Sequence, residues 1–345
     1  MTLAPSGRDA TGAAGRARRA AWLALKVLVA GAALWLAFHQ VSLETLGSAL
    51  SDASAAWVAV AFLSVALTLA AGVGRWRLLF YPDHHARSWR NLAYALLIGQ
   101  TVNILLPLRF GELARAGLLS ATDRAPIARV LATLAVERLA DLVILGLATT
   151  LLLLSVSLPQ WLHAPGQALV ALAAAALAVV IALTLDARRA ADWMQRGARR
   201  LPERFHMRAA RHIDEAAAGL SSLRSVSASA QLWGLSAAIL LMAASTNYLL
   251  FVAFGFALPA ASAICLLVVL QVGNTAVSVP GNLGVFHYLT VLTLAVYGID
   301  RERALAYAIV LYAVALLPKI ALGVLIMAVG PHGFSYQAVR QELGR

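Results

Sequence analysis

The chain has 345 residues, of which 61% are hydrophobic and only 13% charged. Soluble domains carry about 25% charged residues, so this composition excludes an ordinary soluble protein. A net charge of +12 would suggest nucleic-acid binding in a soluble protein. Here the arginines lie between apolar runs and no nucleic-acid motif accompanies them. We therefore interpret them as topology signals and expect no nucleic-acid partner.

Long apolar runs dominate the chain. Five of them are each as long as the roughly 17–25 residues that a spanning helix needs, and they cover residues 22–38, 55–73, 167–185, 232–258 and 304–330. Irregular loops and open sheet edges cannot face lipid. The sequence therefore predicts an all-α polytopic membrane protein with about six spanning helices, plus two re-entrant hairpins made of broken helices.

The charges between these runs predict their orientation. Residues 1–20 are rich in Gly, Ala and Arg, which indicates a disordered cytoplasmic tail, whereas residues 39–54 contain no Lys or Arg and belong outside. No small-residue cleavage site follows the first run, so we expect an uncleaved helix there. With residues 331–345 as a second cytoplasmic tail, both termini lie inside, and we expect the bacterial cytoplasmic (inner) membrane.

Residues 21–330 are predicted to form a single membrane domain with two halves, about 21–156 and 167–330. Within the second half, residues 186–229 carry nine arginines and no lysine, with apolar residues at helical spacing. This pattern predicts amphipathic helices on the inner leaflet, attracted to anionic lipid. The segment is too short and too polar to be a soluble catalytic domain.

A broken apolar segment at residues 91–119 is the first informative feature. Limbs at 92–106 and 113–119 flank a break from Pro107 to Gly111, and arginines place both ends inside. The alternative of two full crossings fails because the return limb is too short. We predict a re-entrant hairpin whose Arg109, Glu112 and Arg115 share one face at three-residue spacing.

A second broken segment predicts an inverted repeat. Its limbs, 264–279 and 285–297, flank a break from Pro280 to Gly284. We predict that this segment enters the membrane from outside, although this places Arg301 and Arg303 outside as well. In each half two spanning helices, a hairpin and a spanning helix follow in order, with opposite orientation. Paired broken helices in inverted repeats are typical of transporters that bind substrate near the membrane midplane.

The helix predicted at 125–156 carries charges at depth. If Arg129 lies at the interface, Glu137 and Asp141 lie about 12 and 18 Å deeper at 1.5 Å per residue, and Arg138 is spaced to pair with Asp141. Charges there cost at least about 2.5–3.5 kcal/mol each, so they should be paired and face protein or water. Either an ion-pair clamp between helices or a polar pathway explains them.

No metal site or cofactor is expected. The single cysteine, Cys265, excludes an intramolecular disulfide and a cysteine-ligated metal. His84 and His85 adjoin Asp83, but two neighbouring loop histidines without structural ligand spacing are more often simply solvated.

Four motifs resemble one membrane family. They are Gly74-Arg-Trp76, Asn103…Pro107-Leu-Arg-Phe-Gly-Glu112…Arg115, Glu137-Arg-Leu-Ala-Asp141 and Pro280-Gly-Asn-Leu-Gly-Val-Phe286. Their order over residues 20–330 resembles the flippase-like family named for the transmembrane region of lysylphosphatidylglycerol synthase, which includes hopanoid-associated members. The resemblance implies the moving or handling of lipids such as aminoacylated phosphatidylglycerol, hopanoids or isoprenoid-linked carriers. Many members have Gly-Gly after the second-hairpin proline and a Glu nearby, where this chain has Asn282 and His287.

These observations favour a lipid translocase with membrane lipids, especially anionic headgroups, as partners. The alternatives are an intramembrane transferase with Glu137 or Asp141 as base, and a non-transporting partner of lipid-synthesis proteins. We expect no enzyme, because no phosphate loop or soluble catalytic domain is found. His287 either titrates on the path or is a neutral, hydrogen-bonded histidine. The predicted substrate path consists of Asn103, Pro107, Arg109, Gly111, Glu112, Arg115, Glu137, Arg138, Asp141, Asn274, Pro280, Gly281, Asn282, Gly284 and His287.

Overall fold

A computed structural model describes residues 43–105, 110–155, 160–198, 203–276 and 282–329. Within these ranges the chain is helical and contains no strand. The elements are α2 (Leu43–Ser51), α3 (Ala55–Leu78), the short 3₁₀ helix η1 (Asp83–Ala86), α4 (Trp89–Leu105), α5 (Gly111–Asp123), α6 (Ile127–Ser155), α7 (Gln160–Ala198), α8 (Glu203–Gly219), α9 (Ser221–Arg224), α10 (Val226–Ala253), α11 (Ala260–Ala276), α12 (Val285–Val296) and α13 (Arg301–Val329).

Four helices of the described part are long and apolar enough to cross a membrane: Ala55–Leu78, Gln160–Leu185, Val226–Ala253 and Arg301–Gly323. They correspond to four of the predicted spans, so the all-α polytopic class is confirmed. The predicted first helix at 21–38 lies outside the described residues. The predicted helix at 125–156 is present as α6, which carries four charged residues and is not among these four.

Two helices differ from the sequence prediction. The predicted outside loop at 39–54 contains α2, which packs on α13. Helix α7 begins at Gln160 rather than near 167 and continues to Ala198. Pro165 lies in its second turn, where only one helical hydrogen bond is lost. At 1.5 Å per residue, its 39 residues span about 58 Å, well beyond the roughly 30 Å hydrocarbon core.

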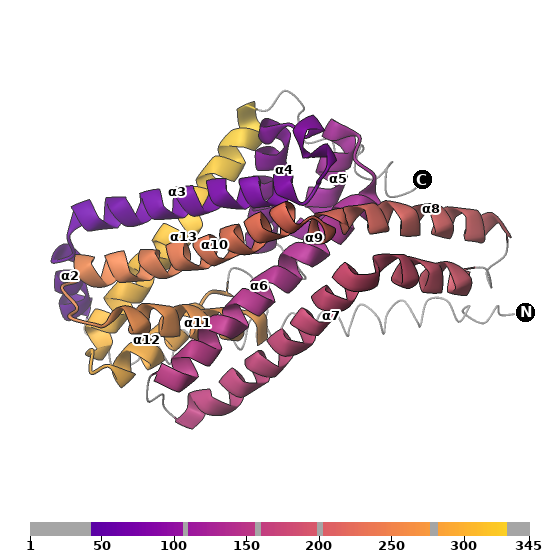
Figure 1. Cartoon of the computed structure of the whole chain (residues 1–345). Helices are drawn as coiled ribbons and strands as arrows, with labels where there is room; N and C mark the ends of the chain where they lie inside the picture. The colour runs from indigo at the N-terminus through magenta and orange to yellow at the C-terminus, as the bar shows by residue number, and fades with distance from the viewer. Residues whose placement is uncertain (1–42, 106–109, 156–159, 199–202, 277–281, 330–345) are drawn as a thin grey trace, which may run out of the picture.

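Helix α8 packs along the distal part of α7 and against α6, and the pair extends away from the other helices in Figure 1. Its last residue, Gly219, lies so close to α6 that an added Cβ would be 2.8 Å from the Arg129 carbonyl oxygen. The described parts of the arginine-rich segment are thus largely helical, and α8 is docked on α6. Its position on the inner leaflet stays a prediction.

Each broken segment forms a pair of helices that pack together, α4 with α5 and α11 with α12. The connecting residues 106–109 and 277–281 lie outside the described part. In the first pair the helices nearly touch at Gly99 and Gly111, where a Cβ on Gly111 would be 2.0 Å from the Gly99 carbonyl oxygen. Asn103 Oδ1 accepts the Gly111 N–H at 2.7 Å, so this side chain ties the start of α5 to α4.

Helices α3 and α10 form an antiparallel pair that joins the two halves (Figure 1). At one end the Ser54 N–H donates to the Ala253 carbonyl at 2.9 Å, and at the other Arg75 donates to the Ser236 hydroxyl at 3.1 Å. Around this pair, α4 packs on α13, and α11 packs on α6. Each hairpin therefore contacts the last helix of the opposite half as well as that of its own.

Candidate functional site

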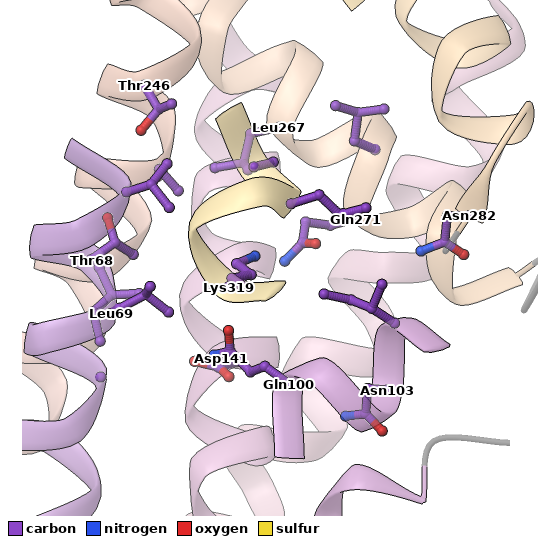
Figure 2. Close-up of a pocket in the computed structure, with 18 of the residues that line it drawn as sticks. Thr68, Leu69, Gln100, Asn103, Asp141, Thr246, Leu267, Gln271, Asn282 and Lys319 are labelled. Atoms are coloured by element: carbon purple, nitrogen blue, oxygen red, sulfur yellow. The ribbon is translucent and has the colours of Figure 1, made fainter. Parts of the chain in front are cut away.

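A cavity of about 660 Å³ opens where the helices of the two halves meet. Residues of α3, α4, α5 and α6 line it together with residues of α10, α11, α12 and α13. Figure 2 shows polar side chains from both groups facing the same space. The lining is mixed, with leucines and other apolar residues between four cations and three carboxylates. This composition suits a ligand that is charged at one end and apolar at the other.

Glu137 lies at the centre of the buried charges. Its Oε1 accepts from Arg75 Nη2 at 3.2 Å, and its Oε2 accepts from Arg115 Nη2 at 3.1 Å. All three side chains are at most 8% exposed. One carboxylate on α6 therefore holds a guanidinium from α3 and another from α5, so it fixes three elements around the cavity.

Arg75 is the most connected of these side chains. It pairs with Asp141 as well as Glu137, and it donates to the Ser236 hydroxyl on α10. Arg75 lies in the last turn of α3 and is buried. A fork of several donors lets one guanidinium bridge two carboxylates and a hydroxyl, which makes Arg75 the link between α3, α6 and α10.

The predicted pair of Arg138 with Asp141 is present but secondary. Its Nη1–Oδ2 distance is 3.7 Å, whereas Arg138 Nη2 lies 2.7 Å from Glu112 Oε1 on α5. Asp141 contacts Arg75 more closely than it contacts Arg138. Residues three apart on a helix are neighbours, but here the partners on facing helices lie closer to both Arg138 and Asp141. Arg138 is also the most exposed cation of the group, at 54%.

Trp76 positions the Arg115 guanidinium. The ring is fully buried, and the Arg115 guanidinium carbon lies 4.1 Å from its centroid, within the range of a cation–π contact. The Trp76 Nε1–H donates to Thr133 Oγ1 at 3.2 Å, which orients the ring against α6. The Gly74-Arg-Trp76 motif thus supplies both an ion-pair partner and a support for a second arginine.

The cavity brings together many residues of the predicted path. Those among its described lining residues are Asn103, Glu112, Arg115, Glu137, Arg138, Asp141 and Asn282. Gly111 and Gly284 have backbone roles: Gly111 permits the close approach of α4 and α5, and Gly284 precedes α12 with φ 83°. Pro107, Arg109, Pro280 and Gly281 lie outside the described residues, and so does the side chain of Asn274 in α11.

His287 is not among the described residues that line the cavity. Its side chain is 5% exposed and packs with its ring 5.0 Å from the ring of Tyr312. The ring centroids of Phe286 and His287 are 6.0 Å apart. Tyr312 and Phe286 line the cavity themselves.

Sequence reasoning missed Lys319, Gln100 and Gln271 as cavity residues. Lys319 had a usable signal, because an ionisable residue inside an apolar spanning helix is by default a candidate for function. It lies in the middle of the last long apolar run, directly after Pro318. The two glutamines carry no such signal, since amides are common at helix contacts.

The fold and the site together define a polytopic membrane protein whose helices enclose a charged cavity. The chain belongs to the family described as the lysylphosphatidylglycerol synthase transmembrane region, whose model matches residues 23–323. This match confirms the resemblance found in the motifs and connects the protein with membrane lipids. No individual curated protein matches the chain.

Proposed function

We propose that the protein is a lipid translocase of the bacterial inner membrane, with both termini in the cytoplasm. It moves an anionic or zwitterionic lipid, or an isoprenoid-type lipid, between the leaflets. One observation carries the proposal: a cavity of about 660 Å³ lined from both halves, with arginines and carboxylates at its wall and leucines between them. A headgroup would enter this cavity while its chains stay in the bilayer.

The arrangement of helices supports an inverted repeat. The corresponding helices of the two halves are α3 and α10, α4 and α11, α5 and α12, and α6 and α13. Each packed pair of these helices has a counterpart if the helices of the first half are replaced by those of the second. The contact of α4 with α13 becomes that of α11 with α6, and the contact of α5 with α6 becomes that of α12 with α13. Such repeats allow alternating access, because each half can rock against the other around a central site.

The ion pairs at the cavity wall would control the rocking. Arg115 and Arg138 connect α5 to α6 through Glu137 and Glu112. The pair of Arg138 and Glu112 is the more exposed, so an anionic headgroup that enters the cavity would compete for Arg138 first. Its arrival would loosen the first hairpin from α6. We propose this exchange as the coupling between binding and movement, with no separate nucleotide-driven motor.

The test is lipid movement in liposomes that contain the purified protein. A fluorescent anionic lipid should move between leaflets faster than in protein-free liposomes, measured by quenching of the outer leaflet. Arg138→Gln should slow it at least about tenfold, because a charge-assisted contact contributes roughly 1.5–3 kcal/mol. Arg211→Gln is the matched control, since Arg211 is exposed on α8, and should match the parent.

Movement no faster than in protein-free liposomes, across several anionic lipids, would count against translocation. Mass spectrometry of the same liposomes separates the alternatives. A lipid changed in mass would favour an intramembrane transferase, and unchanged lipid would favour a non-transporting partner of lipid-synthesis proteins.

A further inference from the structure

The charges that line the cavity do not balance. Among its described lining residues the cations are Arg75, Arg115, Arg138 and Lys319, and the anions are Glu112, Glu137 and Asp141. This leaves one positive charge in excess. Each carboxylate lies within ion-pair distance of at least one arginine, so the arginines take up all the negative charge.

Lys319 is the cation left over. Among the described residues, no carboxylate forms an ion pair with it. It lines the cavity near the middle of a predicted span, and Figure 2 shows its amino group directed into that space. An unpaired cation in such a place is costly. A ligand of opposite charge would offset that cost.

The backbone at Lys319 is held firmly while its side chain stays free to bind. Thr101 Oγ1 on α4 donates to the Lys319 carbonyl at 3.2 Å. One turn later Gly323 lies so close to α4 that an added Cβ would be 2.1 Å from Thr101 Oγ1. Pro318 adds rigidity just before Lys319, since its φ is fixed. The Lys319 side chain therefore extends from a fixed backbone position next to α4.

Two carboxamides line the cavity with this cation. Gln100 comes from α4 and Gln271 from α11, and Figure 2 draws Gln271 beside Lys319 and Gln100 beside Asp141. Gln100 Oε1 is buried and has no hydrogen-bond partner among the described residues. The carboxamides offer both donors and acceptors, whereas a lysine ammonium binds phosphate as a compact point charge. This set suits a phosphate ester whose neighbouring hydroxyl donates to Gln100.

We propose that Lys319, with Gln100 and Gln271, forms a subsite for a singly charged phosphate ester, so that the cavity prefers headgroups of net charge −1 to headgroups of net positive charge. The inference rests on the proposed function and narrows its cargo. A phosphodiester with one negative charge balances the charges of the described lining residues. A lysyl-esterified phosphodiester, with net charge +1, would add to the excess.

Calorimetry on the purified full chain in detergent tests the subsite without any transport. The probes are dioctanoyl phosphatidylglycerol, its lysyl ester and inorganic phosphate. Lys319→Gln should weaken phosphatidylglycerol binding about 10- to 100-fold, the loss expected for one charge-assisted contact. Lys319→Arg keeps the charge and should retain affinity within about threefold. Arg211→Gln removes the same charge outside the cavity and should change nothing.

The parent protein provides a second measurement that needs no folded variant. Its affinity for phosphatidylglycerol should exceed its affinity for the lysyl ester at least about tenfold, because the charge contact is favourable for phosphatidylglycerol and repulsive for the lysyl ester. Equal affinity of the parent and Lys319→Gln, or tighter binding of the lysyl ester, would overturn the proposal. Lys319-dependent binding of inorganic phosphate alone would support the anion subsite and assign it to free phosphate. Binding as expected without transport in liposomes would uphold the subsite and refute the translocase.

Discussion

Replacing Glu137 by alanine should destabilise the protein more than removing any exposed carboxylate. The side chain is 8% exposed and pairs with both Arg75 and Arg115. Its loss leaves two buried guanidinium groups without their shared partner. Breaking a buried ion pair from one side costs about 3–5 kcal/mol. That cost comes mainly from the stranded charges, so the magnitude follows from burial rather than from the number of contacts.

The expected shift in melting temperature follows from the size of the chain. An unfolding entropy of roughly 2.1 cal/mol/K per residue over 345 residues gives about 0.7 kcal/mol/K. A loss of about 3–5 kcal/mol then lowers Tm by about 4–7 °C. Tryptophan fluorescence during heating, in one detergent for all variants, measures this shift. Glu137→Gln should fall between the parent and Glu137→Ala, because the amide keeps the volume and part of the hydrogen bonding.

Glu215→Ala is the matched control. Glu215 is 18% exposed, but its partners on α8, Arg211 and His212, are 79% and 63% exposed, so its loss strands no buried charge. Exposed pairs contribute about 0–1 kcal/mol, so Tm should fall by less than about 1.5 °C. Equal Tm values for the Glu137→Ala and Glu215→Ala variants would refute the reasoning. The double change Arg115→Ala/Glu137→Ala should cost less than the sum of the single changes, because it removes the one cation that Glu137→Ala strands, while Arg75 keeps its pair with Asp141.

Two further predictions concern packing and topology. Gly111→Ala should lower stability by at least about 1–3 kcal/mol, because its Cβ would overlap the backbone of α4. Gly234→Ala, with open space at its Cβ, should raise stability by about 0.4–1 kcal/mol. Thermal unfolding of both variants checks this, and a stable Gly111→Ala protein would contradict it. In a Cys265→Ala background, a cysteine at Ser48 should react with an impermeant reagent added to intact cells, and one at His85 should not. Outside labelling at His85 would reverse the predicted orientation.

The sequence alone determined the long apolar helices and the two places where apolar segments break, but it did not predict α2. Apolar runs of spanning length can only be helices in lipid, because every backbone polar group must be satisfied within the segment. For the same reason Pro107 and Pro280, each with a glycine four residues later, indicated the two broken segments. The ends of helices were predicted less exactly. Helix α7 continues past Leu185 because its polar end needs only water and the contact with α8, not lipid.

Tertiary structure decided which charges meet. Spacing along α6 predicted that Arg138 pairs with Asp141, but Arg75 from α3 and Glu112 from α5 approach this helix from facing elements. Residue spacing describes neighbours on one helix and contains no information about what a second helix brings. The apolar run of α3 stops just before Arg75, and only the packing of α3 against α6 and α10 shows that Arg75 is buried.

Lys319 illustrates the division between the two levels. Its place inside an apolar run marks it as unusual from the sequence, since a charge in a spanning helix is costly. Among the described residues Lys319 has no carboxylate partner, because every carboxylate around it pairs with arginine. This outcome depends on seven side chains from four helices. The balance of charge in a cavity is a property of the assembled fold, because Coulomb interactions act through space and not along the chain.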